Sequence, residues 1–117
     1  MDRVSHDDSL REVRTVAISG STNPLELVPA RVDRRPIVTH LWFTAAGATN
    51  LEFNSFNGST DTPLSGIFAA NTTTTPNTWG GNGAPVLVGR AMGDSIRTDN
   101  SGTVALVGFA VVEYARI

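Results

Sequence analysis

Short segments of alternating apolar and polar residues recur along this chain, and turn residues separate them every eight to twelve positions. The clearest segment is IVTHLWF, residues 37–43. Its residues divide between one face with Ile37, Thr39, Leu41 and Phe43 and another with Val38, His40 and Trp42. Alternation with a period of two predicts a β-strand. Ser, Thr and Asn supply 31 residues and glycine another 11, a composition that disfavours helices. The sequence therefore predicts an all-β fold.

Seven or eight short strands are predicted in total. They fall within residues 13–19, 25–32, 37–43, 49–56, 62–71, 84–89, 94–99 and 103–117. Pro29 cannot donate a hydrogen bond to a neighbouring strand, which predicts an edge position for the second segment. The last segment is apolar on both faces, as is typical of a strand that is central in its sheet or covered twice. Gly47, and the turn from Asn100 to Gly102, predict two hairpins. This spacing is expected of a single jelly roll or β-sandwich.

The uneven distribution of charge predicts the domain organisation. Residues 1–35 hold twelve of the twenty charged residues, whereas residues 36–89 hold only Glu52 and Asp61. We interpret residues 1–12 as an N-terminal arm that contacts a neighbouring molecule, and residues 13–117 as one β-sandwich domain. The predicted core of that domain consists of Leu41, Phe43, Leu51, Phe53, Ile67, Leu87, Ile96, Leu106 and Phe109.

The segment NTTTTPNTWGG, residues 71–81, is predicted to be a long loop that carries a tryptophan. Pro76 stiffens the loop, so that Trp79 can serve as an anchor. Its ring either folds back over its own sandwich or inserts across a subunit boundary, where tryptophan is a frequent hot spot. Because the loop is uncharged, our hypothesis is the intersubunit anchor.

Further interface residues are predicted from residue type. All nine basic residues are arginine, which suits bidentate pairing at interfaces better than lysine does. The interface candidates are Trp79, Pro76, Trp42, Arg11, Arg14, Arg34 and Arg35.

No catalytic, cofactor or metal site is predicted. His6, Asp7 and Asp8 are interpreted as a solvated polar run, and His40 as a hydrogen-bonded surface or interface histidine. Gly93-Asp94-Ser95 resembles the nucleophile motif of small esterases. Both histidines precede that serine, so a turn into a strand explains the three residues better. We therefore expect a protein that is not an enzyme.

Charge and hydropathy also indicate which partners to expect. The net charge of −2 argues against nucleic-acid binding by phosphate neutralisation. No run approaches the ~20 apolar residues of a membrane span. The first fourteen residues contain no apolar signal-peptide core, which predicts a protein made or assembled inside a cell. The chain has no cysteine, and this excludes disulfides and thiolate metal sites.

Two stretches, LEFNSFNGSTDTPLSGIFAAN and PVLVGRAMGDSIRTDNSGTVALVGFAVVEY, give the chain a family resemblance. From residue 37 to residue 114 the order of its signals resembles a group of small phage virion proteins with a jelly-roll or sandwich fold. In that group a PLSG step, a short AAN strand, a neutral loop and a G-[DE]-S-[IL] turn precede the terminal strand. The final strand is longer here, and residues 1–36 are not covered by the resemblance.

The resemblance implies a capsid decoration (cement) protein that binds and stabilises the head shell of a bacteriophage. Its implied partners are the major capsid protein and further copies of itself, with a homotrimer expected from the threefold axes of icosahedral lattices. Its implied location is the virion, assembled in the cytoplasm of a bacterial host. The alternative is a carbohydrate- or receptor-binding module of a phage fibre or spike, in which Trp42, Trp79 and Tyr114 would stack on sugar rings.

Overall fold

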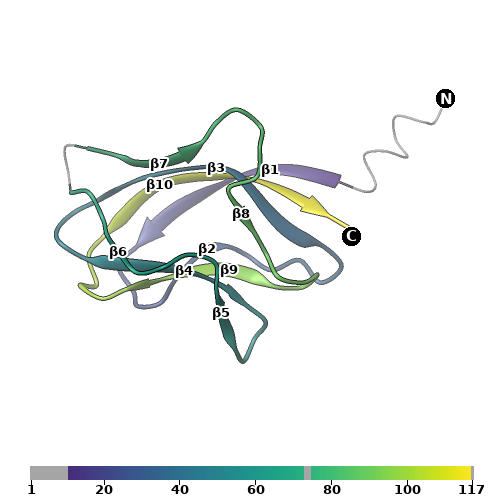
Figure 1. Cartoon of the computed structure of the whole chain (residues 1–117), viewed down its shortest axis with the longest axis horizontal. Helices are drawn as coiled ribbons and strands as arrows, with labels where there is room; N and C mark the ends of the chain where they lie inside the picture. The colour runs from purple at the N-terminus through teal and green to yellow at the C-terminus, as the bar shows by residue number, and fades with distance from the viewer. Residues whose placement is uncertain (1–10, 73–74, 117) are drawn as a thin grey trace.

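The computed structural model describes residues 11–72 and 75–116, which contain ten strands and no helix. The strands form two antiparallel sheets packed face to face, so the prediction of an all-β, sandwich-like fold is confirmed (Figure 1). The strands are β1 (Arg11–Gly20), β2 (Leu25–Val28), β3 (Arg35–Ala45), β4 (Asn50–Phe56), β5 (Asp61–Pro63), β6 (Phe68–Ala69), β7 (Asn77–Gly80), β8 (Leu87–Val88), β9 (Ser95–Asn100) and β10 (Leu106–Ala115).

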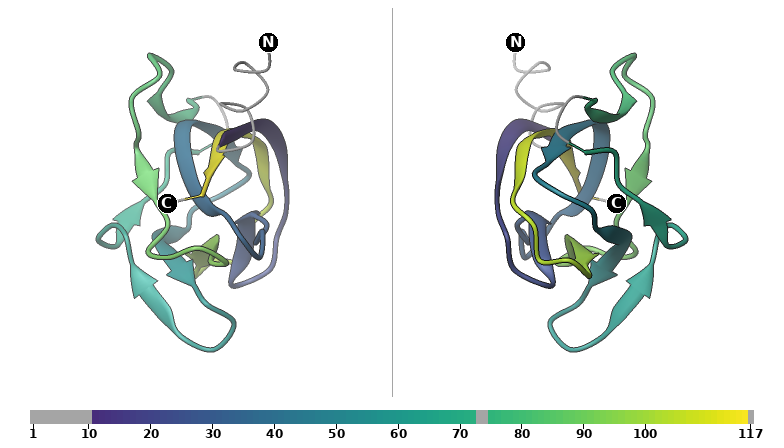
Figure 2. Two further views of the ribbon diagram at one scale, coloured as in Figure 1. Left: turned by 90° about the vertical axis from the view of Figure 1, so that its right-hand side faces the viewer. Right: turned by 90° about the vertical axis from the view of Figure 1, so that its left-hand side faces the viewer.

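Strands that follow one another in the chain mostly lie in different sheets. Sheet A has the order β1-β10-β3-β7, with β8 also paired to β3. Sheet B has the order β2-β9-β4-β5, with β6 also paired to β4. The chain therefore crosses between the sheets repeatedly, as the end-on views show (Figure 2). Two predicted positions are confirmed, because β2 is an edge strand and β10 is central.

Both predicted hairpins are wrong. The connection from β3 to β4 and the connection from β9 to β10 each run from one sheet to the other. Their backbone groups bond to each other rather than closing a hairpin: the Ala46 N–H donates to Ala105 O at 2.9 Å, and the Ser101 N–H donates to Asn50 O at 3.1 Å. Turn residues identify where the chain reverses, but the pairing of neighbouring connections decides which sheet it enters next.

The side chain of Asn100 holds these two connections together. It is fully buried. Its Oδ1 accepts a hydrogen bond from Thr49 Oγ1 at 2.7 Å, and its Nδ2 donates to Val104 O at 2.9 Å and Thr22 O at 3.2 Å. The hydroxyl of Thr49 in turn accepts from the Gly102 N–H at 2.9 Å. Buried polar groups are tolerated when they are paired in this way.

A β-bulge changes which residues of β3 face the core. His40 lies opposite Val111, but the next partner pair is Val38 with Val112, so two residues of β3 span one step of β10. The bulge reverses the alternation at Thr39. Val38 therefore joins the core cluster with Leu41, whereas strict alternation placed these two side chains on opposite faces.

The predicted core is right at seven of its nine positions. Leu41, Phe43, Leu51, Phe53, Leu87, Ile96 and Leu106 are buried. Ile67 is wrong, since 72% of it is exposed. Phe109 is also wrong: it lies outside the core cluster, while its neighbour Ala110 is fully buried. The side chains of β10 that face inward are therefore those of even number, and Phe109 lies on the outer face of sheet A.

Three predicted boundaries need correction. The long loop at residues 71–81 is wrong for Asn77–Gly80, which form β7 and pair with β3. The single strand predicted at 62–71 is divided into β5 and β6, with Ser65 and Gly66 between them. The predicted arm, residues 1–12, lies outside the described residues except for Arg11 and Glu12, and these two belong to β1.

Candidate functional site

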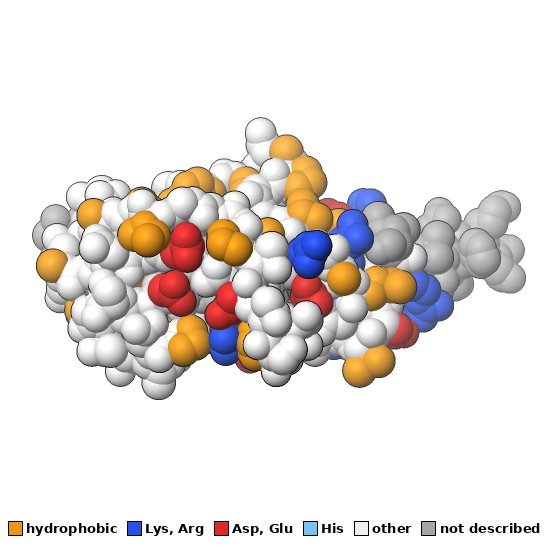
Figure 3. All heavy atoms as spheres, turned by 60° about the horizontal axis from the view of Figure 1, so that its bottom comes forward, with side chains coloured by type: hydrophobic (Ala, Val, Ile, Leu, Met, Phe, Trp, Pro, Cys, Tyr) orange, Lys and Arg blue, Asp and Glu red, His pale blue; other side chains and the backbone are white. Residues whose placement is uncertain are grey.

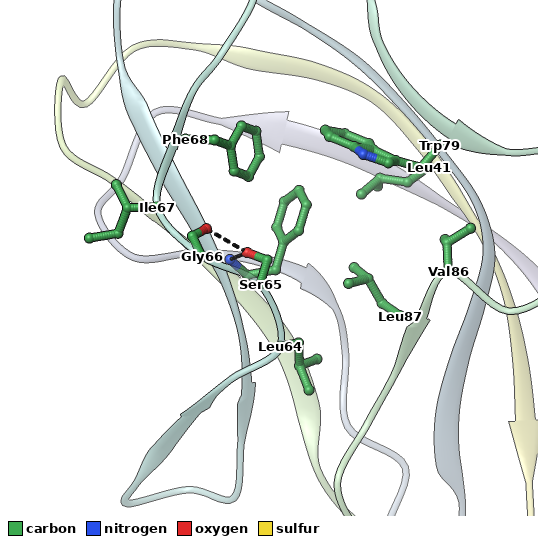
Figure 4. A pocket seen from close by; sticks show the side chains of 10 residues that line it. Leu41, Leu64, Ser65, Gly66, Ile67, Phe68, Trp79, Val86 and Leu87 are labelled. Atoms are coloured by element: carbon green, nitrogen blue, oxygen red, sulfur yellow. Dashed lines mark hydrogen bonds between the residues drawn. The ribbon is translucent and has the colours of Figure 1, made fainter.

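An apolar pocket opens along one side of the sandwich, between the edge of sheet A at β7 and β8 and the edge of sheet B at β6 (Figure 4). Its volume is about 450 Å³. The lining residues are Leu41, Phe53, Leu64, Ser65, Gly66, Ile67, Phe68, Trp79, Val86 and Leu87. Pockets of a few hundred Å³ with mainly apolar and aromatic linings are typical binding sites for apolar groups.

Trp79 belongs to an aromatic cluster at this pocket. The pairing of Trp79 with Leu41 turns the indole toward the interior of the sandwich. Its ring centroid lies 5.3 Å from that of Phe53 and 5.6 Å from that of Phe68, both edge to face, and 5.9 Å from that of Phe43. These are favourable geometries for aromatic pairs. Trp79 therefore packs on its own chain while part of its ring stays exposed.

Ser65 fixes the wall of the pocket opposite Trp79. Its hydroxyl accepts a hydrogen bond from the Phe53 N–H at 2.9 Å and donates to Gly66 O at 2.9 Å. The Leu64 N–H donates to Phe53 O at 2.7 Å. These bonds hold the segment along β4 so that Phe68 faces the cavity, while Ile67 lies at the rim of the pocket with its side chain pointing outward (Figure 4). The exposure of Ile67 follows from this local turn, which alternation cannot predict.

The predicted interface residues are brought to three separate places. Trp79 lies at the pocket, and Pro76 lies directly before β7. Trp42 lies on the outer face of sheet A, where its ring stacks on Phe109 at 5.9 Å and 14°. The four arginines lie together at the end of the sandwich where β1 and β3 begin.

This arginine-rich end gathers residues that are distant in the sequence. Arg11 and Arg35 both lie opposite Ala115 of β10. Two acidic residues bind several of the guanidinium groups: Glu12 contacts Arg14 at 3.3 Å and Arg31 at 2.7 Å, and Glu113 contacts Arg11 at 3.2 Å. The arginines at this end are Arg11, Arg14, Arg31, Arg34, Arg35, Arg90 and Arg116.

Arg34 is the most buried arginine of this end. Its side chain is 8% exposed, and its Nε lies 3.9 Å from Asp33 Oδ1. Within residues 11–72 and 75–116, the Nε and Nη1 of Arg34 and the Nε of Arg35 have no hydrogen-bond acceptor. Buried donors of this kind are costly unless an acceptor is supplied.

The remaining candidates for chemistry occupy structural positions. Gly93 has a φ of 90°, and β9 begins at Ser95, so the predicted turn into a strand is confirmed. Asp94 is buried and accepts a hydrogen bond from Ser55 Oγ at 2.7 Å. His40 contacts Phe109 edge to face at 5.2 Å on the outer face of sheet A, and His6 lies outside the described residues. No cluster of three or more metal-ligating side chains occurs in the described part of the chain.

Sequence reasoning missed the pocket and the outer face of sheet A. Phe68 and Leu64 were placed in one continuous strand, which hid the turn that aims them at the cavity. The outer face did have a signal in the sequence, because β10 is apolar on both sides.

The sequence matches no protein-family model, and comparisons with curated proteins and with solved structures gave no match. The described segments include no helix that is long and apolar enough to cross a membrane.

Proposed function

We propose that the two-sheet fold is a jelly roll. The strand order supports this assignment. Sheet A has the order β1, β10, β3 and β8, where β8 pairs with β3 as β7 does, and sheet B has the corresponding order β2, β9, β4 and β5. The first and last strands are neighbours, as they are in a chain folded into one long hairpin and then rolled into two sheets.

We propose that the protein is a non-enzymatic structural component of a bacteriophage virion, a decoration protein that binds the major capsid protein and stabilises the head shell. The observation that carries this proposal is the strand order, because it agrees with the jelly-roll fold that the resemblance implies. A fold alone does not define a function, so the binding surfaces must supply the rest. In this proposal the protein joins the virion during assembly in the bacterial cytoplasm.

The arginine-rich end is the surface that best fits a contact with the shell. Arg11 and Arg14 present side chains that are 58% and 55% exposed. A carboxylate or carbonyl oxygen of a partner would accept hydrogen bonds from these exposed guanidinium groups. Charge-assisted and bidentate hydrogen bonds of this type are stronger than neutral ones. Salt should therefore weaken the contact with the shell.

Cosedimentation with shells assembled from the major capsid protein of the same phage genome tests this function. We expect the protein to sediment with the shells and to saturate at a fixed ratio to capsid subunits. Replacing both Arg11 and Arg14 with Gln should weaken binding at least tenfold, whereas Arg97→Gln, on the outer face of sheet B, should leave it unchanged. Absence of binding to shells, together with retention on a glycan array, would replace this function by the fibre or spike module.

A further inference from the structure

Three adjacent rows of the outer face of sheet A form a continuous uncharged surface. The strand register arranges its side chains in rows across β1, β10, β3 and β7. The middle row is Ala17, Phe109, Trp42 and Thr78, and the rows beside it are Ser19, Val107 and Thr44, and Thr15, Val111 and His40. These three rows contain no Asp, Glu, Lys or Arg. Charge first appears in the next row, where Glu113 binds Arg11.

The apolar side chains of this face are uncovered by the described part of the chain. Val107 is 55% exposed and Val13, in the row with Glu113, is 58% exposed. Phe109 lies between His40 and Trp42 with part of its ring open to solvent. A central strand with an apolar outer face normally has a layer above it. Here the layer beneath β10 comes from sheet B, and the layer above it is missing from the described residues.

The outer face of sheet B has the opposite character. Its strands carry Glu26, Glu52, Asp61, Arg97 and Asp99. Arg97 pairs with both carboxylate oxygens of Asp61 at 2.9 Å and lies over the ring of Phe56. Acidic side chains gather on this side of the molecule (Figure 3). Two copies brought together through sheet B would oppose like charges, whereas two copies brought together through sheet A would not.

We propose that the outer face of sheet A binds a second copy of this chain in a twofold, face-to-face contact centred on Trp42 and Phe109. An uncharged sheet face is self-complementary, and a surface that meets its own copy closes a dimer. Two sheets pack in this way about 10 Å apart, with their side chains interdigitated. This twofold contact departs from the homotrimer expected from lattice symmetry, and it does not depend on the proposed function.

The size of the face sets the expected strength of the dimer. Strands about 4.8 Å apart and rows about 6.8 Å apart give four strands and the three uncharged rows an area on the order of 400 Å². A contact between two such faces buries roughly 800 Å² in total, which is the size of a weak, transient contact. We therefore expect a reversible dimer whose population rises with protein concentration.

Sedimentation velocity over a concentration series tests the proposal, using the full chain. The wild type should pass from monomer to dimer as concentration rises. Val107→Arg and Ala17→Glu each place a charge at an exposed position of the face. In the dimer this charge lies near the identical charge of the second copy, so each variant should raise the dissociation constant about 30-fold or more. Val32→Arg is the matched control, because Val32 is 92% exposed in the turn before β3 and lies off the face. It should dimerise as the wild type does.

Circular dichroism should show the same β-fold in all three variants. A wild type that remains monomeric, or that forms a trimer, would overturn the proposal. Dimerisation of both Val107→Arg and Ala17→Glu with wild-type affinity would overturn it as well.

Discussion

Tyr114 shows how one residue fixes the end of the sandwich. It is the single tyrosine of the chain, and it is 2% exposed. Its hydroxyl donates a hydrogen bond to Pro29 O at 2.7 Å, which ties the end of β10 to the segment after β2. The guanidinium of Arg31 lies 5.4 Å from the centre of its ring. Burial raises the pKa of the Tyr114 hydroxyl, with a smaller opposing contribution from Arg31.

This raised pKa predicts a loss of stability at alkaline pH. The folded chain holds the phenol proton more tightly than the unfolded chain, whose tyrosine pKa is about 10. The contribution of Tyr114 is therefore fully present below about pH 10 and is lost as pH rises through the folded pKa. The chain contains no lysine or cysteine, so no titration of those side chains overlaps the ionisation of Tyr114 in this range. Denaturant unfolding at pH 8 and pH 11 should show the decrease, and Tyr114→Phe should remove most of it.

Asn100 is a second residue on which the fold depends. Replacement by Ala leaves the Thr49 hydroxyl without its acceptor and removes the Asn100 donor from Val104 O and Thr22 O. Each unsatisfied buried group costs about 1–3 kcal/mol, so we expect Asn100→Ala to lower the free energy of unfolding by about 3 kcal/mol. Asp99→Ala, one position away on the outer face, should change it by less than about 1 kcal/mol. Equal losses in the two variants, measured by urea unfolding, would contradict this role.

At the scale of single elements, β10 is the strand that organises the molecule. It lies between β1 and β3 and contacts the core through its even-numbered side chains, while its odd-numbered side chains form the outer face. Both sides are apolar, so hydropathy could not decide which side is inward. The register with β3 decides it, because Ala110 pairs with the buried Leu41.

The orientation of β10 can be tested with matched phenylalanines. Phe43→Ala removes a fully buried ring and should cost about 3–5 kcal/mol of unfolding free energy. Phe109→Ala removes a partly exposed ring of the outer face and should cost the monomer about 1 kcal/mol. Thermal or urea unfolding at a concentration too low for dimers provides the comparison. A larger loss for Phe109 would mean that the strand faces the other way.

At the scale of the whole molecule, the sandwich exposes three different surfaces. The pocket at Trp79 opens between two sheet edges. The arginine-rich end gathers charged residues from four segments of the chain. The three uncharged rows of the outer face of sheet A form the third surface. The intersubunit role first assigned to Trp79 remains a prediction. Its contacts with Phe53 and Phe68 place most of its stabilising effect within its own chain.

Trp79→Ala separates the two roles of that ring. Because the ring packs on three phenylalanines but remains partly exposed, we expect the monomer to lose about 2–3 kcal/mol of unfolding free energy. The fraction of the protein found in dimers or on shells should then decrease only in proportion to the fraction that is unfolded. Weakened assembly at unchanged monomer stability would instead restore the intersubunit anchor. Thr78→Ala, on the other side of the same strand, is the control for monomer stability only, because Thr78 lies in the proposed dimer face.

The sequence by itself determined the all-β class, most strand positions and most of the core. These follow from local chemistry: alternation marks a strand with one buried face, and Gly, Asn and Pro mark the turns. It also predicted correctly that β10 is central, because a strand that is apolar on both faces is typically central in its sheet or covered twice.

The tertiary structure alone decided which strands pair. The reversals at Gly47 and Asn100 look like hairpins locally, but the two connections bond to each other and send their strands into opposite sheets. It also decided the facing of Val38 and Ile67, because a bulge or a tight turn shifts alternation by one residue. It decided the facing of Phe109 because β10 is apolar on both sides, so that only its register with β3 fixes the inward side. The pocket and the arginine-rich end are likewise built from segments far apart in the chain. Their proximity is a consequence of pairing, and no single stretch of sequence encodes it.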